Sequence, residues 1–299
     1  MMKYYKIGET DIEIGSKYLN LYLDENNYEE DQNNLRNKLK ENGYLLIKGL
    51  HDKQEISSIR KKIISILTKD DIFDSGKNEI TGNLKEGIIK TSTVRGNEKI
   101  KIPELDILYS RNKFTSFFEN LLGGEIISPE FKWLRTVGKG SSSKTHCDSV
   151  YMGRGTKKML TCWTPIGDVS PQMGGLAICL NSHKKNEILK TYAKSDVDID
   201  LIEGHFTDNP LEMVDKFGCK WATTHFKAGD VLIFSIFLMH ASLTNTTNSL
   251  RISCDTRYQR KDDKRDNRWF GECPLMHYRF HDDNNIKEKL VDSRLRWGI

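Results

Sequence analysis

Residues 229–259 read GDVLIFSIFLMHASLTNTTNSLRISCDTRYQ: an apolar run, a polar turn and a second run of strand-forming residues. The first run, VLIFSIFLM at 231–239, is too short to cross a bilayer and is typical of a buried strand that emerges at His240. The turn would return the chain, so we expect Arg251 to lie beside Ser242 across a hairpin. A guanidinium and a hydroxyl side by side form a receptor for a carboxylate.

Four shorter runs upstream have the same character. FKWLRTV, HCDSVYM, MLTCWTPI and LAICL follow one another between residues 131 and 180, separated by clusters of glycine, proline, serine and asparagine. We expect each run to form a short strand. A series of strands without a long intervening helix is typical of a jelly roll or a similar double-sheet barrel.

The first part of the chain has a different pattern. GYLLIKGL at 43–50 predicts a buried strand, and isoleucines recur at helical spacing in the segment 52–69. A second helical pattern covers 103–122 and stops at Gly123 and Gly124. The sequence therefore predicts a mainly β protein of the α+β class, with helices packed outside a jelly-roll core.

We expect one domain over residues 1–299, because barrels and sandwiches of this size often form a single unit. Its expected parts are a peripheral N-terminal segment (1–42), a mainly helical flank (43–124), the jelly-roll core (125–260) with a charged insertion (184–222), and a C-terminal extension (261–299). Long insertions of this kind often serve as lids.

The composition limits the classes of partner. The net charge of +4 comes from 46 basic against 42 acidic residues, and the basic run at 257–268 also contains acids, so we expect no nucleic-acid partner. The start of the chain has no apolar leader pattern, and we expect no membrane partner. The six cysteines lack C-x-x-C pairs, which favours reduced thiols and a soluble cytoplasmic protein. The sequence does not indicate an oligomeric state.

The segment KTHCDSV, residues 144–150, places a histidine two residues before an aspartate. On a strand His146 and Asp148 would face the same way. His240 can complete a facial triad of two histidines and one carboxylate, which is a ligand set for iron(II). The chain has a second pair at this spacing, His281 and Asp283, but no histidine follows it and its surroundings are typical of a polar turn.

An iron held by this triad beside Ser242 and Arg251 needs a ligand with two functions. The ligand must chelate the metal at one end and present a carboxylate at the other. 2-Oxoglutarate has that shape. We therefore predict Fe(II) as the metal, with 2-oxoglutarate and O2 as cosubstrates.

The combination of H-x-D, a distant H-x-S and an arginine nine residues beyond that serine resembles the phytanoyl-CoA dioxygenase family of Fe(II)/2-oxoglutarate-dependent oxygenases. CWTPIGDV, MGGLAICLNSH and AGDVLIF match further pieces of the family pattern, over roughly residues 40–260. One departure is LNSH, where members commonly carry a proline and a glycine before the serine; it concerns a turn and leaves the ligands unchanged.

The resemblance implies a double-stranded β-helix core of the jelly-roll or cupin type. It implies that His146, Asp148 and His240 bind Fe(II), and that Ser242 and Arg251 hold the tail carboxylate of 2-oxoglutarate. It also matches Trp163 to the family's cosubstrate-pocket tryptophan, although a strand tryptophan is most often a core residue.

Three further residues are candidates for substrate binding. Tyr151 and Arg154 follow the metal-binding segment directly, where a substrate could lie. Arg257 shares the inward face of Arg251 if the strand has no bulge, and it either contacts the substrate or pairs with an acid inside the barrel. Two arginines, Arg154 and Arg257, near one opening of the expected barrel predict an anionic small-molecule substrate.

The leading hypothesis is a dioxygenase that hydroxylates or otherwise oxidises an unactivated C–H bond of a small metabolite, with release of succinate and CO2. The alternative is a non-catalytic jelly-roll module that binds a metal or an anion. Such a module would not need Ser242 and Arg251 as a pair. The sequence does not identify the substrate, because family members act on several classes of metabolite.

Overall fold

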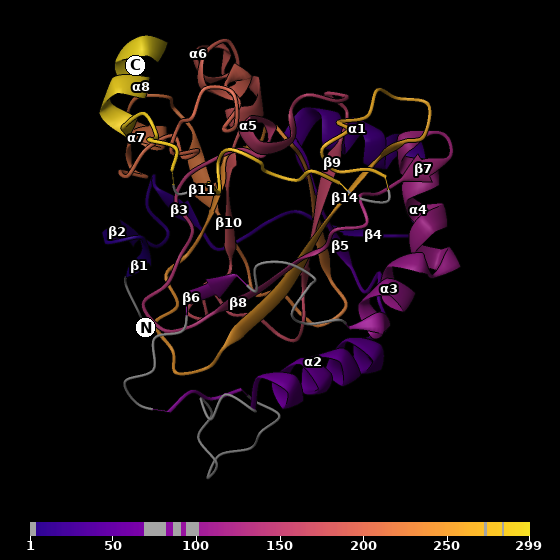
Figure 1. Cartoon of the computed structure of the whole chain (residues 1–299). Coiled ribbons are helices and arrows are strands. Elements are labelled where there is room, and N and C mark those ends of the chain that lie inside the picture. Colours follow the sequence, from indigo (N-terminus) through magenta and orange to yellow (C-terminus); the bar gives the residue numbers. More distant parts are fainter. Residues whose placement is uncertain (1–3, 69–81, 86–90, 94–101, 272–273, 283) are drawn as a thin grey trace.

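Two β-sheets form the centre of the molecule (Figure 1). The computed structural model describes residues 4–68, 82–85, 91–93, 102–271, 274–282 and 284–299. The major sheet has the strand order β4 (Glu25–Asn27), β5 (Tyr44–Lys48), β12 (Val231–Ser235), β9 (Leu160–Pro165), β14 (Arg251–Arg260), β8 (Trp133–Val137) and β6 (Thr91–Thr93), and β7 (Ile126–Ile127) pairs with β14. The minor sheet has the order β13 (His240–Ser242), β10 (Leu176–Leu180), β11 (Lys220–Ala222) and β3 (Leu19–Asn20). The predicted double-sheet β core is confirmed.

Alternation along the buried strands separates two hydrophobic cores. In β12, Val231 and Ile233 pack with the helices outside the major sheet, whereas Leu232 and Phe234 face the space between the sheets. Trp163 lies directly opposite Leu232 in the neighbouring strand and belongs to the same inner core. The apolar run therefore fills both faces of one strand, as a centrally placed strand requires.

Helices cover the outer faces of both sheets. Figure 1 shows α2, α3 and α4 along one side of the molecule, and α6, α7 and α8 grouped on another. The bounds are α1 (Gln32–Asn42), α2 (Lys53–Thr68), α3 (Pro103–Ser110), α4 (Asn112–Leu122), α5 (Ser149–Met152), α6 (Asn186–Leu189), α7 (Glu212–Asp215) and α8 (Leu290–Trp297). The N-terminal residues form a hairpin of β1 (Tyr4–Ile7) and β2 (Thr10–Glu13) and supply the edge strands β3 and β4. None of the helices within the described ranges combines the length and the apolar character that a membrane crossing needs.

Two predicted elements differ from the structure. The helix expected over 103–122 is two helices, because Arg111 between them is extended, with φ −59° and ψ 135°. The run 146–152 is not a strand: His146 forms a single bridge to His240, and the chain then turns into the short helix α5. Asp148 already has a helical backbone, with φ −70° and ψ −17°.

The predicted hairpin between Ser242 and Arg251 is wrong. β12 ends at Ser235, and a turn carries the chain across to β13 in the minor sheet. β14 then pairs with β8 and β9 in the major sheet. Ser242 and Arg251 consequently approach each other from opposite sheets and not across a pair of neighbouring strands.

His51 is a buried histidine in an aromatic environment. Its ring stacks on Phe114 with 4.7 Å between the centroids and meets the edge of Tyr109 at 5.6 Å. In the described part of the chain, no residue makes a hydrogen bond to its Nε2. Burial, with a smaller contribution from the charge of Lys113, lowers the pKa of His51 to about 3. The folded protein therefore holds this ring in its neutral form.

This burial predicts a loss of stability in acid. Between the ordinary pKa of 6.5 and the folded value of about 3, the unfolded chain binds a proton that the folded chain does not, so stability falls as the pH falls. His51→Phe removes this proton-linked contribution to stability. The free energy of unfolding of the variant, relative to that of wild type, should therefore rise by up to about 1.4 kcal/mol for each pH unit below about 6. Urea unfolding at several pH values measures the difference.

The matched control is His225→Phe, since the side chain of His225 is exposed. That variant should follow the wild-type pH dependence. Parallel pH curves for wild type and His51→Phe would contradict the assignment of this acid sensitivity to His51.

Candidate metal centre and its two cavities

Three predicted ligands converge at one point between the sheets. The ligand atoms of His146, Asp148 and His240 all lie within 4.8 Å of one another. Oδ1 of Asp148 is 3.9 Å from Nε2 of His146 and 3.8 Å from Nε2 of His240. The two histidines are held in register by reciprocal backbone hydrogen bonds of 3.0 and 2.8 Å. The site is thus built by the fold, from segments far apart in the chain.

Both imidazoles are oriented by backbone carbonyls. Nδ1 of His146 donates to the carbonyl of Lys144 at 2.7 Å, and Nδ1 of His240 donates to that of Leu238 at 3.0 Å. With its proton on Nδ1, each ring presents the bare Nε2 to the shared point. Burial lowers the pKa of His146 to about 3, so this ring stays neutral. Neutral imidazoles with a free Nε2 are metal ligands.

The carboxylate of Asp148 is fixed from its other side. Its Oδ2 accepts hydrogen bonds from Thr161 Oγ1 at 2.5 Å and from Arg257 Nη2 at 3.0 Å. Burial alone would raise the pKa of Asp148, but the charge of Arg257 and the hydrogen bond from Thr161 hold it well below its usual range. Oδ1 therefore faces the histidines as an anionic oxygen. Arg257, for which the sequence left two roles open, lies against this acid.

A small inner cavity of about 110 Å³ adjoins the ligands and contains the predicted cosubstrate residues. Arg251, Ser242 and Trp163 all line it. Arg251 is 3% exposed; it donates to Ser253, and no partner of its Nε is found among the described residues. Buried donors without acceptors are costly, so this end of the cavity favours an anion.

A larger outer cavity of about 600 Å³ meets the inner one at the ligands. The residues common to both cavities are Arg135, Ser143, His146, Asp148 and Arg257. The rest of the wall of the outer cavity is rich in aromatic rings and methionine, and it includes Trp133, Trp269 and Phe280. A wider surface cleft of about 680 Å³ beside His51 contains none of the predicted site residues.

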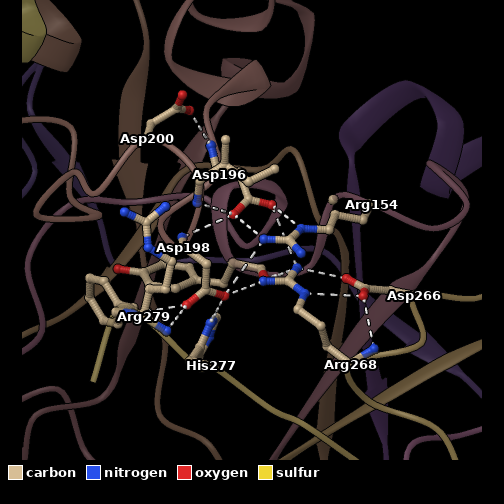
Figure 2. Close-up of polar contacts among 12 residues, drawn as sticks. Arg154, Asp196, Asp198, Asp200, Asp266, Arg268, His277 and Arg279 are labelled. Atoms are coloured by element: carbon tan, nitrogen blue, oxygen red, sulfur yellow. Dashed lines mark hydrogen bonds and ion pairs between the residues drawn. The ribbon is translucent and has the colours of Figure 1, made fainter. Parts of the chain in front are cut away.

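The predicted substrate residues lie in different places. Tyr151 lines the outer cavity, with its ring edge-on to His146 at 5.7 Å. Arg154 is not among the lining residues: it makes a two-pronged ion pair with Asp196 of the insertion, at 2.6 and 2.8 Å. Figure 2 shows this pair within a larger group of charged residues. The structure does not bring Arg154 to the site.

Sequence reasoning missed Arg135 and Thr161. Trp133, Arg135 and Val137 alternate along β8 and all line a cavity, so the inward face of this strand could have been read from its period of two. Arg135 donates through Nε to Asp255 at 2.5 Å, and no other hydrogen bond of its guanidinium is found in the described part of the chain. Of the second H-x-D pair, His281 lines the outer cavity and Asp283 falls outside the described residues.

Comparisons with known proteins agree with this geometry. The model of the phytanoyl-CoA dioxygenase (PhyH) family matches residues 39–253. No curated protein matches the chain. The structure is similar to that of the epimerase SnoN in complex with Fe3+, alpha ketoglutarate and nogalamycin RO, with 16% identity, a TM-score of 0.57, and coverage of 82% of this chain and 93% of the other.

A second similar structure is that of EctD from S. alaskensis with 2-oxoglutarate and 5-hydroxyectoine, with 17% identity, a TM-score of 0.56, and coverage of 86% of each chain. At such low identities these likenesses establish the fold, and they confirm the predicted jelly-roll core. The family is established by the match to its model, which spans most of the sequence. The chain belongs to the phytanoyl-CoA dioxygenase family, and it is an iron- and 2-oxoglutarate-dependent oxygenase.

Proposed function

We propose that the protein is a dioxygenase that hydroxylates, or otherwise oxidises, an unactivated C–H bond of a small anionic metabolite. The observation that carries the proposal is the convergence of His146, Asp148 and His240 where two cavities meet. One cavity suits a dicarboxylate cosubstrate, and the other is large enough for a second small molecule.

The donor set fits iron(II). Two neutral imidazole nitrogens and one carboxylate oxygen would occupy one face of the metal and leave the remaining positions open. When bound, the iron and 2-oxoglutarate would activate O2, which is the oxidant: one oxygen atom would enter succinate as 2-oxoglutarate loses CO2, and the other would oxidise the substrate. The chain's own part is to orient the ligands, through the Lys144 and Leu238 carbonyls and through Thr161.

The inner cavity is proposed as the 2-oxoglutarate site. Arg251 would pair with the tail carboxylate, and the Ser242 hydroxyl would add a hydrogen bond. Ser242 Oγ already accepts the backbone N–H of Ser143 at 2.5 Å, so its own proton remains free to donate. Trp163 would form an apolar wall of the site, since it packs edge-on against Phe226 at 4.8 Å.

Charge balance supports an anionic substrate. Arg135, Arg251 and Arg257 line the inner cavity together with two carboxylates, Asp148 and Asp255, and the outer cavity adds one further ion of each sign, Lys144 and Glu203. Bound Fe(II) and 2-oxoglutarate would cancel each other's charges, so one positive charge would remain uncompensated in a site of low dielectric constant. Arg135 would meet the substrate's anion, because one edge of its guanidinium is open and its side chain is 33% exposed.

Two further inferences concern organisation and location. We infer that the chain forms a single oxygenase domain, because the insertion and the C-terminal extension both contribute to the wall of the outer cavity. A cytoplasmic location is supported by the five described cysteines, all of which are buried and unpaired.

Replacing a ligand tests the metal site. His146→Ala or His240→Ala removes one of three ligands, so each should abolish substrate-dependent succinate formation and weaken Fe(II) binding. Anaerobic titration with Fe(II) and 2-oxoglutarate measures the visible charge-transfer band of the chelate. His281→Ala is the matched control, and it should keep the band. Wild-type succinate formation by either ligand variant would remove that histidine from the site.

Replacing Arg251 tests the cosubstrate site. Arg251→Ala should weaken 2-oxoglutarate binding by about 2 to 5 kcal/mol, because the carboxylate would be left desolvated and unpaired. Arg251→Lys keeps the charge but loses the two-pronged donor geometry of the guanidinium, and its 2-oxoglutarate binding should be weakened less than that of Arg251→Ala. Fe(II) affinity measured without cosubstrate should stay near that of wild type. An unchanged 2-oxoglutarate affinity in Arg251→Ala would contradict this assignment.

Replacing Arg135 tests the charge of the substrate. The probes are 3-(4-hydroxyphenyl)propionate and its neutral amide, added to the anaerobic Fe(II) and 2-oxoglutarate complex and followed by equilibrium dialysis. The acid should bind wild type about tenfold more tightly than the amide, which corresponds to about 1.4 kcal/mol. Arg135→Gln should abolish this preference, and Arg154→Gln, whose guanidinium lies outside the cavities, should keep it.

Weakened 2-oxoglutarate binding in Arg135→Gln, with the preference for the acid retained, would move Arg135 to the cosubstrate site. Loss of the preference in Arg154→Gln alone would restore Arg154 as the anion receptor.

A further inference from the structure

Part of the outer cavity wall lies beyond the family match. The match ends at residue 253, whereas Trp269, Met276, His277 and Phe280 of the C-terminal segment line the cavity. These side chains surround the space that we propose for the substrate. Residues outside the shared region are the natural place for features that distinguish one substrate from another.

His277 is held by a fully buried carboxylate. Its Nδ1 lies 3.0 Å from Oδ2 of Asp198, which is 0% exposed (Figure 2). Asp198 also accepts the backbone N–H groups of Arg279 and Phe280, at 3.1 and 2.9 Å, and the guanidinium of Arg268. Burial raises the pKa of Asp198, but these donors, with His277 foremost, hold it at about 2. An ionised carboxylate only accepts, so Nδ1 of His277 carries the proton.

The opposite edge of the His277 ring carries Nε2. Burial lowers the pKa of His277 despite the nearby carboxylate, so the ring is neutral near pH 7 and Nε2 is an acceptor. His277 lines the cavity, and no hydrogen bond of its Nε2 is found among the described residues. The ring is flanked by Trp269, edge-on at 4.9 Å, and by Phe280 at 5.6 Å. An acceptor fixed among aromatic rings needs a donor from the ligand.

We propose that His277 is a specificity-determining residue of the substrate site, whose Nε2 accepts a hydrogen bond from a hydroxyl or N–H group of the substrate. The inference rests on the proposed function, because it takes the outer cavity as the substrate site. Asp198 is the positioning residue: it sets the tautomer and the orientation of the ring. The substrate class becomes an anionic molecule with an apolar body and a hydrogen-bond donor away from its acid group.

Arg268 and Asp266 support this arrangement from behind. Arg268 pairs with Asp266 at 2.7 Å and donates to the Tyr151 carbonyl at 2.9 Å, so the segment that carries His277 is tied to the segment that follows the metal ligands. The group shown in Figure 2 therefore joins three segments behind one wall of the cavity. A purely structural role for His277 would end at this network, and the test must separate the two roles.

The test uses three probes on the anaerobic Fe(II) and 2-oxoglutarate complex. 3-(4-Hydroxyphenyl)propionate has a donor, its methyl ether has lost the donor but is larger, and 3-phenylpropionate has lost the oxygen and is smaller. Wild type should bind the hydroxyl probe about tenfold more tightly than either analogue, as a buried neutral hydrogen bond allows. Binding is measured by equilibrium dialysis and by the shift of the visible band.

Two variants distinguish the roles of the two ring nitrogens of His277, Nδ1 and Nε2. His277→Asn places an amide near the position of Nδ1, so it can keep the contact with Asp198 while losing the acceptor toward the cavity. His277→Gln reaches the position of Nε2 and gives up the contact with Asp198. The preference for the hydroxyl probe should disappear in His277→Asn and be partly rescued in His277→Gln. Both variants should keep the wild-type 2-oxoglutarate affinity.

Three results would overturn the proposal. The first is a wild type that binds the probes equally or binds none of them. The second is a His277→Asn variant that keeps the preference while its melting temperature falls, which is the signature of a structural role. The third is a His277→Asn variant that keeps both the preference for the hydroxyl probe and the wild-type melting temperature. A wild type without a visible band would instead contradict the proposed function, and dialysis would still report whether the hydroxyl is preferred.

Discussion

The reciprocal backbone hydrogen bonds between His146 and His240 are the constraint on which the site depends. They fix two segments that lie far apart in the sequence at one antiparallel bridge. The backbone therefore brings the two imidazoles together, and no contact between side chains is needed to do so. Each ring is then turned by a carbonyl two residues away along its own segment. The remaining ligand, Asp148, enters through the turn into α5 and is held from the major sheet by Thr161 and Arg257. A backbone register thus sets the geometry of the proposed metal centre.

Sequence reasoning identified the core strands other than the run 146–152, the helical segments of the flank and the converging triad, because burial patterns and residue chemistry are local signals. It failed where geometry is decided by distant contacts. His146 and Asp148 converge although they do not share a strand, since a helical Asp148 beside a bridged His146 also brings both side chains to one side. Ser242 and Arg251 share a cavity although they do not share a hairpin. In both cases the residues lie together as predicted, but the predicted path of the backbone between them was wrong.

The contrast between Arg154 and Arg135 shows the limit of proximity in sequence. Arg154 follows the metal-binding segment closely, yet the acid nearest to it in space, Asp196, belongs to the insertion. Arg135 precedes the ligands on another strand and reaches both cavities because its strand alternates toward the interior. Which arginine keeps part of its guanidinium turned to the cavity is decided by where the acids lie, and a single sequence does not contain that pairing. The same reasoning explains why His277 gave no signal: its partner, Asp198, is remote in the chain.

The division of the site between two sheets has a consequence for the life of the protein in the cell. His146 and His240 belong to the minor-sheet side, whereas Thr161, Arg251 and Arg257 belong to strands of the major sheet. Iron and 2-oxoglutarate would bind only when the sheets are closed on each other, so binding would be linked to folding by mass action. The amount of intact protein would then follow the supply of the metal, because a chain short of iron would unfold more often and be removed by proteases sooner. Abundance itself would report iron status, without a dedicated sensor.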